Sequence, residues 1–402
     1  MIDAFTSANI NYLAKARVLA KSLKRYEPEV RMHLMLSDEI PDWLDIEEEP
    51  FDTIITIDDL GLDEKWVFHH SVVELCTAVK PYCFRYLIEK YKSDKLFYFD
   101  PDVVIFSKLT GLVDLLDRHS ILLTPHVCKE DDDLQAIIDN ETSCMRHGIY
   151  NLGFLGIRND DEGNRLVDWW SHRLKHFCHD NIPFGIFTDQ RWMDFVPAFF
   201  DNYKIVRDPV YNVATWNYST RYLSGSMESG ILVDGEPMCF HHFSGVDNGA
   251  SVMMLEKYAQ DMPTAWELDE WYKKVCDDEG QQTVSKHPWF YGYYDNGEKV
   301  EYQDRVLFRT DQGLQEEFDH PFSTTRHGKN HAISFYDWLK NHRSETTVPE
   351  DIHLKPFKVW LGETKSALLW YIDKTTRLSG LLKKIASRIV STTEWGISKF
   401  LK

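Results

Sequence analysis

The chain has 402 residues, enough for one large domain with an appendage or for two ordinary domains. Hydrophobic residues make up 43% and aromatic residues 14%, so the chain can fill a sizeable core and extensive disorder is not expected. The formal net charge is −19. A surface this acidic repels phosphate backbones, so the composition predicts no nucleic-acid partner for the main body.

The charge is unevenly distributed along the chain. Residues 352–402 contain ten Lys or Arg and three acidic residues, so this segment carries +7 and the rest of the chain −26. Apolar residues at 378, 381, 382, 385 and 389 repeat with helical spacing among the basic residues. A basic amphipathic helix lies well on an anionic bilayer, although a helix that docks on the body or on a second chain has the same pattern. We expect a linker and basic amphipathic tail at 344–402 that contacts a membrane peripherally.

The cysteines and the N-terminus bear on the compartment. The seven cysteines are odd in number and include no Cys-x-x-Cys, so neither a disulfide framework nor a zinc knuckle is indicated. The first residues lack the basic start and long apolar stretch of a signal peptide, and no stretch approaches the roughly 20 apolar residues of a membrane span. These features favour a cytoplasmic protein at the inner face of the membrane.

Apolar runs of strand length alternate with amphipathic helical stretches up to about residue 247. Strands are predicted at 2–7, 31–36, 53–57, 95–99, 103–106, 121–124 and 151–157, and helices at 12–26, 72–91 and 165–177. Pro81 predicts a break within the helix at 72–91. The alternation predicts an α/β domain over 1–247 with a mostly parallel sheet flanked by helices. Ligands of such sheets bind beyond the carboxyl ends of the strands.

After residue 248 the pattern changes to a smaller subdomain, predicted at 248–343. Helices are expected at 264–276 and 332–342, with a hairpin at 291–309 that turns at Asp295-Asn296-Gly297. The aromatic segment 287–294 could stack on sugar rings or lipid, but the core of this subdomain is the preferred interpretation.

Asp100 and Asp102 follow the apolar run Lys95 to Phe99. In an extended segment, residues i and i+2 point to the same face, so both carboxylates can reach one cation. Hard oxygen ligands suit Mg²⁺ or Mn²⁺ held against a diphosphate. Asp-Pro-Asp is also a good turn sequence, and most such tripeptides bind nothing. A further alternative is the nucleophile loop of haloacid-dehalogenase-type phosphohydrolases with Asp100 as nucleophile, but that loop normally opens its domain and the later acidic motif is poorly matched at 158–161.

Several further segments occur in an order that resembles glycosyltransferase family 8 and its bacterial relatives of the GT-A fold, over roughly residues 1–247. They are Asn11-Tyr12 with residues 18–23, Lys80 and Arg85, residues 99–103, 150–155, Asp189-Gln190 and 240–245. The sequence departs from the family pattern at two places. Asn9 stands where the family usually has an acid. The Lys-Pro-Trp that usually follows the last histidine is replaced by Val246-Asp247-Asn248.

The resemblance implies a GT-A, Rossmann-like catalytic domain with Mn²⁺ (or Mg²⁺) and a UDP-sugar donor. The implied metal ligands are Asp100, Asp102 and His242. The implied donor-binding residues are Thr6, Ser7, Asn9, Tyr12, Lys80, Arg85 and Asp100. The implied catalytic residues are Asp189, Gln190 and Asn151. Each also has a structural alternative: a buried core histidine for His242, surface pairing for Lys80 and Arg85, a strand-start cap for Asn151 and a helix cap for Asp189.

The resulting hypothesis is a glycosyltransferase that moves a sugar from a nucleotide-sugar to a glycan or lipid-linked acceptor in surface polysaccharide synthesis. The resemblance favours retention at the anomeric carbon, with Gln190 beneath it, whereas an inverting enzyme would use Asp189 as the base. The alternative outside catalysis is a membrane-docked assembly or carbohydrate-binding subunit with a decayed transferase fold, which the departures at Asn9 and 246–248 would suit.

Overall fold

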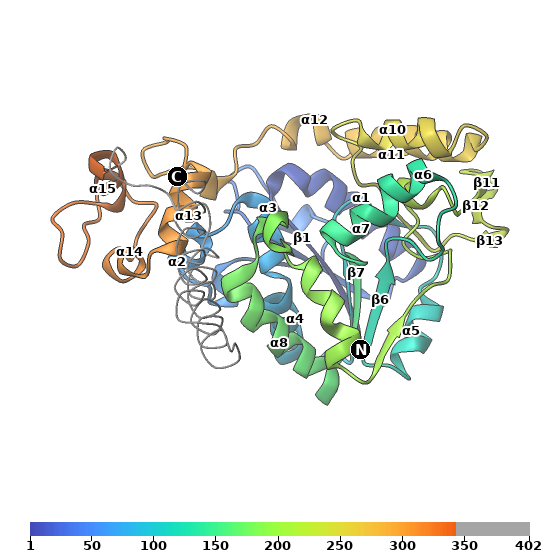
Figure 1. Cartoon of the computed structure of the whole chain (residues 1–402), viewed down its shortest axis with the longest axis horizontal. Helices are drawn as coiled ribbons and strands as arrows, with labels where there is room; N and C mark the ends of the chain where they lie inside the picture. Colours follow the sequence, from blue (N-terminus) through green and yellow to red (C-terminus); the bar gives the residue numbers. More distant parts are fainter. Residues whose placement is uncertain (343–402) are drawn as a thin grey trace, which may run out of the picture.

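The computed structural model describes residues 1–342 (Figure 1). The linker and basic tail predicted at 344–402, with its membrane contact, lie outside the described residues and stay a prediction. Within residues 1–342, no helix combines the length and the apolar character that a bilayer crossing requires.

A seven-stranded sheet forms the centre of the molecule, with the order β10-β6-β7-β4-β1-β2-β3. The strands are β1 (Ile2–Ala8), β2 (Arg31–Leu36), β3 (Thr53–Ile55), β4 (Lys95–Phe99), β6 (Ile121–Pro125), β7 (Tyr150–Arg158) and β10 (Tyr203–Ile205). β7 runs antiparallel to its neighbours β4 and β6, and the other pairs are parallel. The predicted α/β architecture with a mostly parallel sheet is confirmed.

Helices cover both faces of this sheet. They are α1 (Leu13–Tyr26), α4 (Lys80–Tyr91), α5 (Thr110–Leu116) and α8 (Asp161–Phe177). Alternate residues of a strand point to opposite faces, so Leu96 and Tyr98 of β4 pack with α4 and α8, while Phe97 and Phe99 pack with α1 and α5. β4 is therefore buried on both faces, and the first polar side chains after it emerge at its carboxyl end.

Most predicted boundaries in this domain are close to the observed ones, and two differences have simple causes. The helix predicted at 72–91 is two helices, α3 (Val72–Ala78) and α4, and the break falls just before Pro81 as expected. α8 begins at Asp161 rather than at Arg165, because the carboxylate of Asp160 caps it and accepts a hydrogen bond from the N–H of Gly163 at 2.9 Å.

A short antiparallel pair stands apart from the large sheet. β5 (Val103–Ile105) pairs with β14 (Phe240–His242), and the register sets His242 opposite Val103. The N–H of Phe243 donates to the carbonyl of Asp102 at 2.8 Å and extends the pairing by one bond. This pair brings residue 242 beside residue 102.

The C-terminal part of the described chain is helical. Its helices are α10 (Ala250–Tyr258), α11 (Pro263–Asp278), α12 (Gln281–Val284), α13 (Tyr302–Thr310), α14 (Gln312–Glu317) and α15 (Phe335–His342). In Figure 1, α10 to α12 run along the top of the molecule, and α13 to α15 form a lobe at its left in orange. The predicted helices at 264–276 and 332–342 correspond to α11 and α15.

The hairpin predicted at 291–309 is wrong in its second half. Tyr293 and Lys299 do form an antiparallel bridge around Gly297, which has a left-handed φ of 83°. The second strand is instead helix α13, in which every residue from 304 to 309 is buried. A helix satisfies its own backbone in such a buried position, whereas one strand of an isolated hairpin leaves an edge without partners.

The aromatic segment 287–294 connects the two parts of the chain. The indole N–H of Trp289 donates to the carbonyl of Ser37 at 2.9 Å. Tyr294 lies in the core of the C-terminal lobe, as the preferred interpretation expects. Phe290 departs from that interpretation, because its side chain is 57% exposed and borders a cavity of about 890 Å³.

Asp38, just after β2, anchors this segment. The carboxylate is 2% exposed and accepts hydrogen bonds from the backbone N–H groups of Ile10 (3.2 Å), Glu39 (3.2 Å) and Phe290 (2.9 Å). Burial raises the pKa of Asp38 from 3.8 to about 6, and these hydrogen bonds only partly oppose it.

This raised pKa predicts a pH-dependent stability. The folded chain holds the Asp38 proton more tightly than the unfolded chain, so the free energy of unfolding should fall by about 3 kcal/mol as pH rises from about 4 to about 6. Asp38→Asn cannot titrate at this position. In urea unfolding measured between pH 4 and pH 7, it should remove most of the slope of the free energy of unfolding against pH. Glu39→Gln, at an exposed neighbouring position, is the control and should keep it. An unchanged slope in Asp38→Asn would assign the effect to another group.

Candidate metal centre and active site

A cavity of about 450 Å³ opens beyond the carboxyl end of β4. Eight of the residues predicted for the site line it: Tyr12, Lys80, Asp100, Asp102, Asn151, Asp189, Gln190 and His242. They come from the turn into α1, α4, the β4–β5 turn, β7, the segment before α9 (Val196–Phe199) and β14, so the fold gathers them from most of the N-terminal domain.

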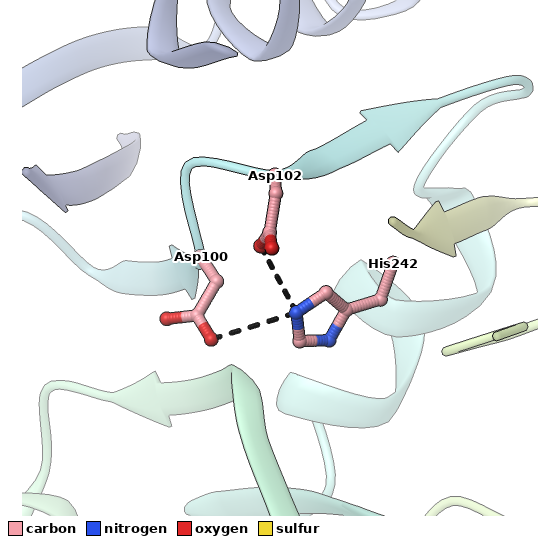
Figure 2. Close-up of side chains that lie close together, drawn as sticks. All are labelled: Asp100, Asp102 and His242. Atoms are coloured by element: carbon pink, nitrogen blue, oxygen red, sulfur yellow. Dashed lines mark ion pairs between the residues drawn. The ribbon is translucent and has the colours of Figure 1, made fainter. Parts of the chain in front are cut away.

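Asp100, Asp102 and His242 lie close enough to bind one ion. Their ligand atoms all lie within 4.8 Å of one another. The Nε2 atom of His242 is 3.0 Å from Oδ1 of Asp102 and 3.7 Å from Oδ2 of Asp100, and Figure 2 shows the three side chains converging. Adjacent ligands of an octahedral ion with bonds of about 2.1 Å stand about 3 Å apart, so the spacing suits Mg²⁺ or Mn²⁺ after a small adjustment.

The hydrogen bonds around His242 determine which ring nitrogen faces the acids. The backbone N–H of Gly153 donates to Oδ1 of Asn151 at 3.1 Å, so this oxygen is an acceptor. Nδ1 of His242 lies 3.1 Å from the same oxygen and therefore carries a hydrogen that it donates. In the neutral ring, Nε2 then directs a lone pair at the Asp102 carboxylate. Two acceptors at 3.0 Å require a cation between them, either a proton on His242 or a metal ion.

The electrostatics of the pair agree with this requirement. Burial lowers the pKa of His242, but the carboxylate of Asp102, and next that of Asp100, outweigh it and the net pKa is raised. Burial likewise raises the pKa of Asp102, but His242 and then Lys15 reverse the effect and the net pKa lies below its ordinary value. Asp102 is therefore ionised and ready to bind a cation.

A second histidine extends the chain of hydrogen bonds behind the site. Asn151 Nδ2 lies 3.2 Å from Nε2 of His126, whose Nδ1 lies 3.2 Å from the carbonyl of Ile149. His126 therefore donates to the carbonyl and accepts from Asn151. Burial lowers the pKa of His126 to about 4, so the ring stays neutral at pH 7 and keeps this direction.

Gly153 leaves the space that His242 needs. A Cβ at this position would lie 2.4 Å from Cε1 and 2.5 Å from Nδ1 of the imidazole. The Asn-x-Gly of β7 thus serves His242 twice, since Asn151 orients the ring and Gly153 makes room for it.

Asn151→Leu is expected to weaken Mn²⁺ binding by about 10–100-fold, the usual cost of losing a partner that orients a histidine ligand. The reason is that His242 would lose the acceptor that fixes its Nδ1–H. Titration of Mn²⁺ followed by electron paramagnetic resonance measures the affinity. Asn151→Asp keeps an acceptor oxygen and should restore much of the binding. Equal affinities of the leucine and wild-type proteins would contradict the orienting role.

At the edge of the Asp100, Asp102 and His242 cluster, Lys80 holds two carboxylates together. Its ammonium is 2.9 Å from Asp189 and 3.4 Å from Asp100, and it also donates to the carbonyl of Leu152 at 3.1 Å. The hydroxyl of Tyr98 donates to Asp100 at 2.5 Å. Lys80 and Asp189 are each about 2% exposed. Burial lowers the pKa of Lys80, but Asp100 and Asp189 outweigh it, so the net pKa is raised and the amine stays charged.

Asp189 does not act as a helix cap. It precedes a 3-10 turn at Gln190–Phe195, but its side chain makes no capping hydrogen bond. One oxygen pairs with Lys80 and the other accepts from the hydroxyl of Thr188 at 3.1 Å. Thr188 has a φ of 43°, a left-handed conformation that is strained for a β-branched residue and that often marks a functional site.

Gln190 is held on both sides of its amide. Its Oε1 accepts from the N–H of Leu152 at 2.9 Å and its Nε2 donates to the carbonyl of His147 at 3.0 Å. The side chain is thus fixed at the cavity wall between β7 and the segment before it.

Four of the predicted donor-binding residues are not brought to the cavity wall. Arg85 is the clearest correction: it lies on the face of α4 that packs toward α8 and pairs there with Asp168. Five residues, or about 1.4 helical turns, separate it from Lys80, which sets the two side chains about 140° apart around the helix. The hydroxyls of Thr6 and Ser7 are buried and have no hydrogen-bond partner among residues 1–342. The amide of Asn9 donates to Asn11 at 2.5 Å.

Some residues at the cavity were not predicted. His126 and Trp216 pack around His242, and the ring of Trp216 meets its imidazole edge to face at 5.2 Å. Residues 134–147 form a helical cover of α6 (Leu134–Ala136), a π-helical turn (Ile137–Glu141) and α7 (Thr142–His147), which contributes Asn140 and Ser143. Only the position of His126 directly after a strand was a usable signal in the sequence.

The phosphohydrolase alternative lacks its second acidic motif at this site. β7 runs antiparallel to β4, with Phe99 opposite Phe154 and Lys95 opposite Arg158. Asp160 therefore lies at the end of the sheet remote from Asp100, where it caps α8.

No protein-family model matches the chain, but two proteins of similar sequence are found in Bacillus subtilis (strain 168). The uncharacterized proteins YfnF and YfnD are 29% and 26% identical to this chain over 204 and 175 residues. The matches span 50% and 43% of this chain but only 63% and 53% of the length of those relatives.

Solved structures that are similar to this chain include several glycosyltransferases. The galactosyltransferase LgtC, solved with donor and acceptor sugar analogs, is 17% identical, with 69% of this chain and 96% of that chain covered and a TM-score of 0.39. GlyE of Streptococcus pneumoniae TIGR4 is 15% identical (71% and 65% covered, TM-score 0.38). Mouse xyloside xylosyltransferase 1 is 14% identical (61% and 98% covered, TM-score 0.37). TM-scores below 0.5 assign no activity by themselves, and membership of family 8 stays a prediction.

Proposed function

We propose that the protein is a metal-dependent glycosyltransferase that moves a sugar from a UDP-sugar to a glycan or lipid-linked acceptor in surface polysaccharide synthesis. The observation that carries this proposal is one cavity at the carboxyl end of β4 that contains both the Asp100, Asp102 and His242 cluster and the buried Lys80–Asp189 pair. Such a cavity is suited to a diphosphate on one side and a sugar on the other.

Asp100, Asp102 and His242 would hold Mn²⁺ or Mg²⁺, which as a Lewis acid offsets negative charge on a departing nucleoside diphosphate. Asn151 keeps the His242 ring in the orientation that exposes its lone pair. Tyr12 presents a ring that is 38% exposed at the cavity and suits stacking on the nucleobase.

The state of Asp189 favours retention. Its side chain is 2% exposed and engaged by Lys80 and Thr188, so it is poorly placed to take a proton from an acceptor hydroxyl. In the proposed step, the bond between the anomeric carbon and the phosphate oxygen breaks, and the acceptor oxygen bonds to that carbon on the same face. The acceptor proton passes to the departing diphosphate. Gln190, fixed by Leu152 and His147, would lie against the sugar.

The test is a thermal-shift screen of UDP-, GDP- and CMP-sugars with and without Mn²⁺, since a specific donor stabilises the folded state by mass action. We expect a shift with a UDP-sugar that depends on Mn²⁺, and a product whose anomeric configuration matches the donor by NMR. Absence of any shift and of any turnover would overturn the proposal and support a non-catalytic carbohydrate-binding or assembly subunit. An inverted product would restore Asp189 as the base.

A further inference from the structure

Lys15 is a buried cation beside the metal cavity that the proposed mechanism has not used. It lies on the first turn of α1 and is 3% exposed. Its ammonium lies over the ring of Tyr12, 4.1 Å from the ring centroid, and Tyr12 lines the cavity. Burial lowers the pKa of Lys15, but Asp102 and Tyr12 outweigh it, so the net pKa is raised and the amine is charged.

Lys15 is much more deeply buried than the carboxylate that pairs with it. The partner is Asp247, five residues after His242 in the segment that leaves β14. The side chain of Lys15 is 4% exposed, whereas that of Asp247 is 49% exposed. The lysine therefore cannot leave its position for water, but the aspartate can.

Two glycines with left-handed backbone conformations flank Asp247. Gly245 and Gly249 have φ angles of 79° and 77°. A Cβ at Gly249 would touch nothing within 4 Å, so this glycine has free space around it. Ser244, just before Gly245, lines the metal cavity. Asp247 can thus swing outward without moving β14 or His242.

The charges of the cavity leave a place for one more cation when a donor binds. Four aspartates line the cavity, and one of them, Asp139, is balanced by its ion pair with Lys257 at 2.5 Å. Asp100, Asp102 and Asp189 carry the other three negative charges, which Lys80 and one divalent ion would balance. A diphosphate adds at least two more. Among the residues described as lining the cavity, Lys80 is the only lysine or arginine, and it is already engaged by two carboxylates. The Lys-Pro-Trp of the family is absent, and Asp247 stands in that stretch.

We propose that Lys15 is a diphosphate-binding cation of the donor site, and that Asp247 occupies its anion position until the diphosphate displaces it. The inference rests on the proposed function, because it assigns a further contact to the same donor. A nucleoside diphosphate fits this position by charge, since it offers oxygen acceptors next to the metal. Its base can stack on the exposed part of the Tyr12 ring, which is 38% exposed beside Lys15.

The experiment measures UDP binding by calorimetry in saturating Mn²⁺ for four variants. Lys15→Met should weaken binding about tenfold or more, because a charge-assisted hydrogen bond to a phosphate is lost. Asp247→Asn should tighten binding several-fold, because the internal competitor loses its charge. The double variant should bind like Lys15→Met, since the gain from Asp247→Asn requires Lys15. Lys273→Met is the control. Lys15 and Lys273 both line a second cavity of about 270 Å³, but Lys273 pairs with Asp269 at 2.6 Å and is 43% exposed.

The outcomes separate the inference from a purely structural ion pair. If the pair only stabilises the fold, both single variants lower the melting temperature and leave the UDP affinity unchanged, which would overturn the inference. If Lys15→Met fails to fold, Asp247→Asn with wild-type Lys15 still decides, because unchanged or weaker UDP binding contradicts displacement. Failure of the wild-type protein to bind UDP would count against the proposed function itself, whereas wild-type binding with no effect of either variant would count against Lys15 alone.

Discussion

Asp102→Asn is expected to abolish Mn²⁺ binding in the micromolar range and to lower sugar transfer by about 10³-fold, which corresponds to about 4 kcal/mol of transition-state stabilisation. Asp102 is the closest carboxylate to His242 at 3.0 Å, and its ionised state is maintained by that neighbour. The amide of asparagine has nearly the same shape but no charge, so the change removes the ligand without removing volume. Transfer of radiolabelled sugar and Mn²⁺ titration measure the two effects.

A matched control distinguishes loss of the ligand in Asp102→Asn from a general effect on folding. Asp114→Asn on the exposed side of α5 makes the same chemical change away from the cavity and should leave binding and transfer intact. Asp102→Asn should also melt near the wild-type temperature in the absence of metal. Full transfer by Asp102→Asn, or by the wild-type protein in chelator, would rule out the metal-dependent mechanism.

Lys80→Met should produce the largest loss of stability of any single change at the site, about 3–5 kcal/mol. It leaves the buried carboxylate of Asp189 and the partly exposed carboxylate of Asp100 without their cation. Asp189 is fully enclosed, and its pKa is already raised by burial against the opposing effect of Lys80. Without the ammonium this pKa should rise further. A group whose folded pKa is raised stabilises the fold below its unfolded pKa and loses that contribution as pH rises. In urea unfolding, the difference in free energy of unfolding between the wild-type protein and Lys80→Met should therefore become smaller toward pH 4.

The same variant should separate metal binding from catalysis. Removal of one positive charge makes the cavity more negative, so Lys80→Met should bind Mn²⁺ more tightly than the wild-type protein while it loses transfer. Lys95→Met is the control, because Lys95 pairs with Asp117 near the other end of β4. Weaker Mn²⁺ binding in Lys80→Met would mean that Lys80 holds the acids in place for the metal rather than competing with it.

The sheet could be predicted because its signals are local. β4 is an apolar run after Lys95 and β2 is mostly apolar, and both occupy the residues that the sequence indicates. The C-terminal lobe was harder, since the turn at Asp295-Asn296-Gly297 is a strong hairpin signal and is indeed a turn. The segment after this turn is helix α13, whose Arg305 and Arg309 donate to the carbonyls of Phe68 and His69, far away in the sequence. Periodicity carries no information about such partners.

Some features of the site could likewise be predicted from local patterns, and others could not. Strand alternation separates His242 from His241: the former faces the acids, and Nε2 of the latter lies 2.7 Å from the hydroxyl of Tyr218 on the other side. The orienting role of Asn151 could not be foreseen, because its partners His242 and His126 come from other parts of the chain. Arg85 was misplaced because its helical spacing was not applied: five residues separate it from Lys80, which turns it by about 140° around α4 and toward Asp168.

The pairing of β5 with β14 also constrains how the protein is made. A chain that emerges from the ribosome presents Asp100 and Asp102 early, but the strand that carries His242 follows only after β6, β7 and β10 have been synthesised. Two carboxylates at a turn would hold a divalent ion weakly without the imidazole, so an ion at this site would stabilise the chain only after β14 has docked on β5.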